Sequence, residues 1–158
     1  MSECEDKLDY LRNLLTPLIG RTLKAVHEYF GDEGLNKIAE VWKEARIKAA
    51  PTMMERAGVK EDERNCIGVA KILDYNDKNY YGIEGEWKEL TPERGVKIVT
   101  KCAIAKNLNW EVCNVCFREA ARGIGIVVTG NPKFKVEVPK SIAAGDDVCE
   151  VIIENKKD

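Results

Sequence analysis

The hydrophobic period changes about halfway along the chain, and this change restricts the folds that the sequence can adopt. In the first half, apolar residues recur every three or four positions, which is typical of amphipathic helices. In the second half they alternate with polar residues, which is typical of strands with one solvated face. We therefore predict an α+β fold in which N-terminal helices pack on one face of a roughly four-stranded antiparallel sheet.

Residues that typically begin or end helices divide the N-terminal half into separate helical segments. Thr16 followed by Pro17 predicts a capped helix start, and Gly31 predicts the end of that helix. Pro51 is expected to break the next helix, because proline has no backbone N–H to donate. A further helix is expected to begin near Glu63.

Four segments of the second half show the alternation expected of strands, and they form two pairs. A helix that begins near Asn109 is predicted between these two hairpins. The alternating segments are residues 81–90, 95–102, 133–138 and 148–154.

Size and composition predict one domain. A chain of 158 residues, of which 44% are hydrophobic and 33% are charged, can bury a single substantial core. We divide this domain, residues 1–158, into a helical part at 1–60 and an α+β part at 62–154.

The charge distribution argues against two classes of partner. The net charge of −2 comes from 25 basic and 27 acidic residues mixed along the chain, without a basic stripe. We therefore expect no binding to nucleic acid or to anionic membranes.

The charged start lacks the apolar stretch of a secretory signal, and no apolar run could span a bilayer, so we expect a cytoplasmic protein. Glutamine is absent while lysine and glutamate are abundant, a composition that leans towards heat-adapted organisms.

Two of the six cysteines lie in predicted strands and are expected to face the core. Cys102 shares one face of its strand with Val96 and Ile98. Cys149 shares a face with the apolar residues of the last strand. Both thiols are therefore expected on the side of the sheet that the helices cover.

A Cys-x-x-Cys pair lies within the predicted helix that begins near Asn109. Side chains three residues apart lie on nearly the same side of an α-helix. If this helix covers the sheet, four thiols face one interior layer, where they are candidate metal ligands. These four are Cys102, Cys113, Cys116 and Cys149.

Three interpretations of these cysteines stay open on the sequence alone. Free cysteine often behaves as a small buried apolar side chain, which is its commonest role. A shared metal site is the second interpretation, with zinc as the cofactor, because zinc binds thiolates readily at about 2.3 Å. A redox dithiol is the third, although the pair lacks the preceding strand of a thioredoxin-like unit.

The sequence presents no well-defined general base to accompany the thiols. His27, the only histidine, lies on the apolar side of its helix, where packing or capping is the expected role. Glu84 and Glu86 lie on the polar face of their strand, which is expected to be solvated. A catalytic role for any of them would require contact with a cysteine.

Three stretches of the second half resemble a known family. They are VTKCAIA at 99–105, CNVC at 113–116 and NPKFKVEVPKSIAAGDDVCEVIIE at 131–154. Their order resembles that of the L-2-amino-thiazoline-4-carboxylic acid hydrolase-like proteins and, more distantly, that of the vinyl-reductase-like small-molecule-binding domains. The resemblance covers roughly residues 62–154. It implies N-terminal helices packed on an antiparallel sheet around a small-molecule pocket.

The resemblance also implies roles for particular residues. In the vinyl-reductase-like relatives that bind zinc, one cysteine ligand lies on the final strand and another lies upstream of it. In this chain Cys149 matches the ligand on the final strand, and Cys113 or Cys116 matches the upstream ligand. The two middle ligand positions fall on Val138 and Ser141, so half of that zinc site is missing here.

Two functions remain after these comparisons of residue types and spacing. The first is a small-molecule-binding domain of the sensor or carrier type, with a cysteine-rich metal site nearby. The second is a hydrolase that opens a cyclic C–N bond of a thiazoline-carboxylate-like substrate, using metal-activated water or the Cys102 thiolate. We prefer the first because a general base is missing, although the sequence does not decide whether the chain is an enzyme. The expected partner is a small-molecule ligand, and homodimerisation stays open.

Overall fold

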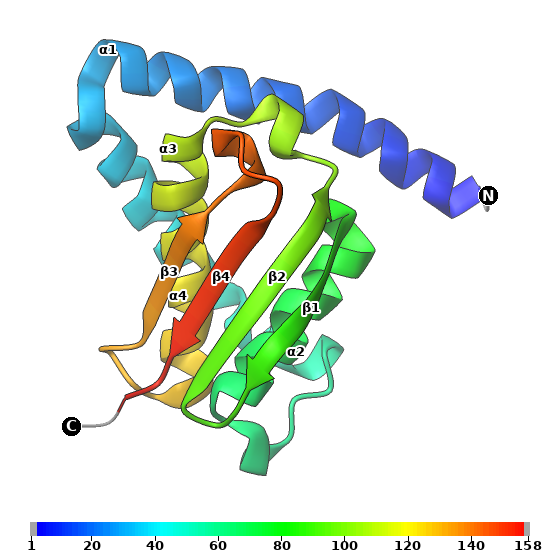
Figure 1. The fold of residues 1–158 in the computed structure, drawn as a ribbon, viewed down its shortest axis with the longest axis vertical. Helices are drawn as coiled ribbons and strands as arrows, with labels where there is room; N and C mark the ends of the chain where they lie inside the picture. The colour runs from blue at the N-terminus through cyan, green and yellow to red at the C-terminus, as the bar shows by residue number, and fades with distance from the viewer. Residues whose placement is uncertain (1–2, 157–158) are drawn as a thin grey trace.

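A computed structural model describes residues 3–156 and shows a sheet with helices on one face (Figure 1). The sheet has four strands in the order β1-β2-β4-β3, and each neighbouring pair is antiparallel. The predicted α+β class is confirmed, including the helical segment between the two hairpins. The helices are α1 (Glu3–Arg56), α2 (Cys66–Asn76), α3 (Trp110–Val112) and α4 (Arg118–Thr129), and the strands are β1 (Ile83–Leu90), β2 (Arg94–Cys102), β3 (Lys135–Lys140) and β4 (Cys149–Glu154).

Short helical turns connect these elements and complete the site described below. Two of them have the wide π geometry, in which the hydrogen bond spans five residues. They are η2 (Asp77–Tyr81), which extends α2, and η4 (Cys113–Phe117), which joins α3 to α4. The 3₁₀ turns are η1 (Glu61–Glu63), η3 (Ala105–Asn107) and η5 (Ile142–Ala144).

The predicted helix breaks at Thr16–Pro17 and at Pro51 are wrong, because α1 continues through both prolines. The Thr16 hydroxyl does not cap a helix start; it donates to the Arg12 carbonyl, 2.7 Å away. Proline removes only one helical hydrogen bond, and contacts with the rest of the fold hold the helix on either side. The expected interruption at Gly31 does exist, as a kink with a φ of 61°.

The predicted inner face of β2 is also wrong. Lys97 and Val99 are buried, whereas Val96 and Ile98 are only half-buried. Cys102 nevertheless reaches the inner face, because a bulge changes the side-chain alternation. Pairing jumps from Gly85–Val99 to Glu84–Lys101, which leaves Thr100 as an extra residue. A bulge of this kind moves all following side chains to the opposite face.

Two apolar clusters form the core. The larger lies between α2, α4 and the sheet and includes Phe134, Ile72 and Ile153, all fully buried. The smaller lies where α1 packs on α3 and η4, and we call it the packed layer. It consists of Leu23, Leu35, Ala39, Val112 and Cys116.

Within residues 3–156, no helix combines the length and the hydrophobicity needed to cross a membrane.

Candidate functional site

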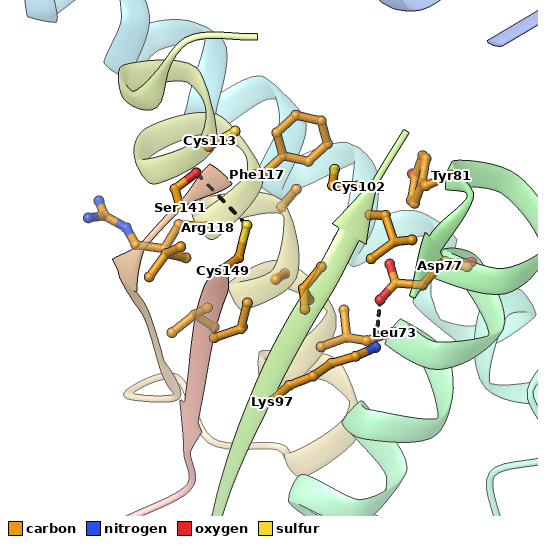
Figure 2. A pocket seen from close by; sticks show the side chains of 18 of the residues that line it. Leu73, Asp77, Tyr81, Lys97, Cys102, Cys113, Phe117, Arg118, Ser141 and Cys149 are labelled. Atoms are coloured by element: carbon orange, nitrogen blue, oxygen red, sulfur yellow. Dashed lines mark hydrogen bonds and ion pairs between the residues drawn. The ribbon is translucent and has the colours of Figure 1, made fainter. Parts of the chain in front are cut away.

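A mainly apolar cavity of about 170 Å³ lies between the inner face of the sheet and the segment that runs from α3 through η4 to α4 (Figure 2). The sheet contributes aliphatic side chains from every strand, and α4 contributes one side of its helix. Polar, sulfur-containing and aromatic side chains also line it: Arg46, Asp77, Tyr81, Lys97, Cys102, Cys113, Phe117, Ser141 and Cys149.

Two thiols and a hydroxyl from different elements meet on one wall of the cavity. Cys149 begins β4, Ser141 precedes η5, and Cys113 begins η4. The backbone N–H of Ile142 donates to the Cys149 sulfur at 3.3 Å, and the Cys149 thiol lies 4.0 Å from the Ser141 hydroxyl (Figure 2). Ser141 is only 1% exposed. The two sulfur atoms make this wall polarisable, and the Ser141 hydroxyl makes it weakly polar.

The two cysteines of the Cys-x-x-Cys pair lie on different sides of the helix. Cys113 lines the cavity, whereas Cys116 belongs to the packed layer and points its thiol at the Leu35 carbonyl, 3.9 Å away. The expectation that both share one face is wrong. It assumed an α-helix, and the wider π turn at this point increases the angle between residues three apart.

The structure brings together three of the four candidate metal ligands. Cys102, Cys113 and Cys149 line the cavity, and Cys116 does not. Across residues 3–156, no three His, Cys, Asp or Glu side chains are grouped so that they could hold a metal ion. The four-cysteine zinc site stays a prediction, and this arrangement of the thiols gives it no support.

Burial keeps two of the cavity thiols, those of Cys102 and Cys113, protonated. It raises the pKa of Cys113 to about 12, and the neighbouring Cys102 and Cys149 add to the effect. Burial likewise raises the pKa of Cys102. Zinc ligands and cysteine nucleophiles act as thiolates. These thiols therefore behave as small apolar groups at neutral pH.

The opposite wall carries a buried ion pair that the sequence analysis missed. The Lys97 side chain is 4% exposed, and its ammonium donates to Asp77 at 2.7 Å and to the half-exposed Asp74 at 2.6 Å. Burial alone would lower the pKa of Lys97, but the two carboxylates raise it instead. Burial raises the pKa of Asp77 against the opposing effect of Lys97.

A second polar contact closes the same side of the cavity. The Arg46 guanidinium of α1 donates to the Tyr81 hydroxyl at 2.6 Å. Arg46 has no carboxylate partner among residues 3–156. A second hollow, of about 420 Å³, lies beyond this contact and shares five of the cavity's lining residues. One layer of side chains therefore separates the two hollows, formed by Arg46, Tyr81, Ile104, Leu108 and Phe117.

The candidate general bases lie elsewhere. His27 pairs with Asp32 at 3.0 Å, and Glu84 pairs with the exposed Lys101 at 2.6 Å. Glu86 pairs with Lys88. None of the three candidate bases lines the cavity.

One signal could have indicated the missed ion pair. Lys97 lies two residues from both Gly95 and Val99, so the three residues share one face of β2. Because that face is the buried one, the Lys97 side chain points inward. Asp74 and Asp77 are three residues apart at the end of α2, so both carboxylates can reach one ammonium.

The fold is similar to that of a solved protein of low sequence identity. This is the trafficking protein particle complex subunit 3 from Naegleria fowleri, in a structure covalently bound to palmitic acid. The TM-score is 0.64 at 13% identity, and the match covers 92% of this chain and 97% of that chain. No family model and no curated protein matches the sequence. At 13% identity the likeness establishes the fold alone.

Proposed function

We propose that the protein binds one small apolar molecule in the cavity, as a carrier or sensor. The cavity itself is the observation that supports this proposal. Ligand sites are typically concave and apolar, with a few polar groups that orient the ligand. Here aliphatic side chains and thiols form most of the wall, and the Arg46–Tyr81 pair adds a polar group.

The volume of the cavity restricts the size of the ligand. An engineered apolar cavity of about 150 Å³ binds benzene in another protein. A cavity of about 170 Å³ therefore suits a single ring or a short branched chain. A long chain such as palmitate would have to pass the Phe117 layer and continue into the second hollow.

Non-covalent binding fits the thiols better than a thioester does. The solved neighbour holds palmitic acid covalently. Attack on an acyl group requires a thiolate, and burial raises the pKa of Cys113 to about 12. We therefore place the ligand in the cavity without a bond to sulfur.

Arg46 and Tyr81 would bind the polar end of the ligand. The guanidinium lacks a carboxylate partner within the described part of the chain and retains N–H donors beyond its bond to Tyr81. A carbonyl or carboxylate at this point would accept hydrogen bonds from Arg46 while the apolar body fills the cavity. A carboxylated heterocycle would satisfy both requirements.

Hydrolysis finds less support than binding in this geometry. Asp77 is the carboxylate that lines the cavity, but its ion pair with Lys97 restricts it as a base. The Cys102 thiol is held in its unreactive protonated form, since burial raises its pKa. These features favour a binding protein.

Native mass spectrometry of the purified full chain tests the proposal. We expect an additional non-covalent mass that organic solvent releases as a small organic molecule. A Cys113→Leu substitution fills the cavity and should abolish this mass, while Cys4→Leu on the exposed N-terminal end of α1 should retain it. Ala121→Leu is a second cavity-filling variant, for use if the first does not fold. Retention of the mass in a folded, cavity-filled variant would contradict the proposal.

A further inference from the structure

The N-terminal half of α1, residues 3–30, carries an apolar stripe that no other part of the described chain, residues 3–156, covers. We call residues 3–30 the arm. Figure 1 shows the arm extending beyond the sheet towards the N-terminus. Four leucines of the arm are about half exposed: Leu11 at 47%, Leu14 at 55%, Leu15 at 46% and Leu18 at 61%. Exposed apolar stripes of this kind typically mark interaction surfaces.

The arm is held by its other face, so the leucine stripe points away from the molecule. Arg12 donates to the Tyr80 carbonyl at 2.6 Å, and Thr16 accepts from the Asn107 amide at 2.8 Å. Leu23 is 3% exposed and belongs to the packed layer. The leucines are spaced by three and four residues and therefore form one stripe on the outward side.

The charges beside the stripe differ between its two ends. Asp6 precedes the leucines, while Arg21 and Lys24 follow them. At 100° per residue, these three side chains lie on the same flank of the stripe. Neither Asp6 nor Arg21 has an ion-pair partner among residues 3–156, and Lys24 has only the exposed Glu28 at 3.8 Å.

We propose that the occupant of the stripe is the arm of a second copy, packed antiparallel about a two-fold axis near Leu14 and Leu15. In antiparallel helix pairs the same flank of each helix faces its counterpart. Asp6 of one copy then lies opposite Arg21 and Lys24 of the other, and two-fold symmetry produces this contact twice. In a parallel pair this flank would instead face the opposite flank of the second helix, where Arg12 already binds Asp9 and the Tyr80 carbonyl, and Asp6 would not meet Arg21 or Lys24. The charge pattern therefore favours the antiparallel dimer.

Light scattering coupled to size-exclusion chromatography tests this proposal on the full chain. We expect a dimer, and we expect Leu14→Glu to be monomeric because it buries two charges in the stripe. Leu14 is exposed in the single chain, so this variant should retain its fold and its helical circular dichroism. A monomeric wild type, or a dimeric Leu14→Glu variant, would overturn the proposal.

Charge reversal tests the orientation. Asp6→Arg and Arg21→Asp should each weaken the dimer about two- to tenfold, because each creates like-charge contacts at both symmetry-related positions. The double variant restores opposite charges and should recover most of the affinity. If the double variant instead loses as much dimer affinity as the two single variants lose together, the antiparallel register is contradicted. Because Asp6, Leu14 and Arg21 do not line the cavity, ligand retention should not change in any of these variants.

Discussion

The helical segment from α3 through η4 to α4 separates two apolar layers that differ in packing. On the α1 side, Val112 and Cys116 pack tightly against Leu35, and all three are essentially inaccessible to solvent. On the sheet side, Cys113 and Phe117 face a cavity. The two layers use similar residue types, so hydrophobicity does not explain why one is filled and the other is hollow.

The hollow layer is maintained at the expense of stability. Cavities lower the free energy of unfolding by about 24 cal/mol per Å³ in a well-studied case. Side chains that face a cavity of about 170 Å³ lack part of the packing contacts of a filled layer, so the hollow layer contributes less to stability than the packed layer does. A bound ligand can recover part of this free energy, because it stabilises the folded state by mass action. The difference between the layers is thus what we expect of a binding site beside a structural core.

The largest effect is expected where the wall of the hollow layer is charged. Lys97→Met leaves Asp77, whose side chain is 16% exposed, without its ammonium partner, and removal of one partner from a buried pair costs about 3–5 kcal/mol. The loss of the contact with Asp74 adds little, because that side chain is 48% exposed. Chemical denaturation measures this change. Lys101→Met is the matched control, since its pair with Glu84 is exposed and should matter by less than about 1 kcal/mol. Equal losses in the two variants would show that the Lys97 pair is not buried in the native protein.

Matched valine truncations compare the two layers directly. Val112→Ala removes two buried methyl groups from the packed layer and should lower the free energy of unfolding by about 2–3 kcal/mol. Val138→Ala removes the same groups from a half-buried position on the cavity wall, where less contact is lost, and about 1 kcal/mol is expected. Urea denaturation of both variants provides the comparison. A larger loss for Val138→Ala would mean that the cavity is not hollow in solution.

Alkaline pH should destabilise the protein through its buried thiols. Burial raises the pKa of Cys113 to about 12 and that of Cys116 to about 11, above the ordinary value of about 9. A group whose folded pKa is raised contributes its full stability below the unfolded pKa and loses it as the pH rises towards the folded value. At pH 10 each thiol should therefore account for a loss of about 1.4 kcal/mol.

Denaturation at pH 8 and pH 10 checks this expectation. Cys113→Ala and Cys116→Ala should each reduce the loss between the two pH values, whereas Cys4→Ala, at an exposed position, should not. An unchanged loss in Cys113→Ala would show that this thiol is hydrated.

The sequence predicts the sheet and its covering helices because their hydrophobic periods are regular. The last strand behaves as its alternation indicates, with Cys149, Val151 and Ile153 facing inward. The helical segment also begins near Asn109 as predicted, where the Asn109 side chain accepts from the Val112 N–H at 3.3 Å. These are local patterns, and local patterns can be obtained from one chain.

Irregular backbone accounts for most of what could not be predicted. The bulge at Thr100 changes the face of β2, and the π turn at Cys113–Phe117 separates the two thiols of the Cys-x-x-Cys pair. Neither irregularity has a marker in the residue pattern. The continuity of α1 through Pro17 and Pro51 depends on contacts with distant segments, which propensity does not contain.

Methyl NMR with benzene as the probe tests most directly whether the hollow layer is a ligand site. If it is, benzene should shift the methyl resonances of Val99, Val138 and Val151, which line the cavity, and leave those of Val112 and Leu35 unchanged. In the Cys113→Leu variant the same titration should produce no localised shifts. Shifts distributed over both layers, or no shifts in the wild type, would contradict the assignment of the cavity as the binding site.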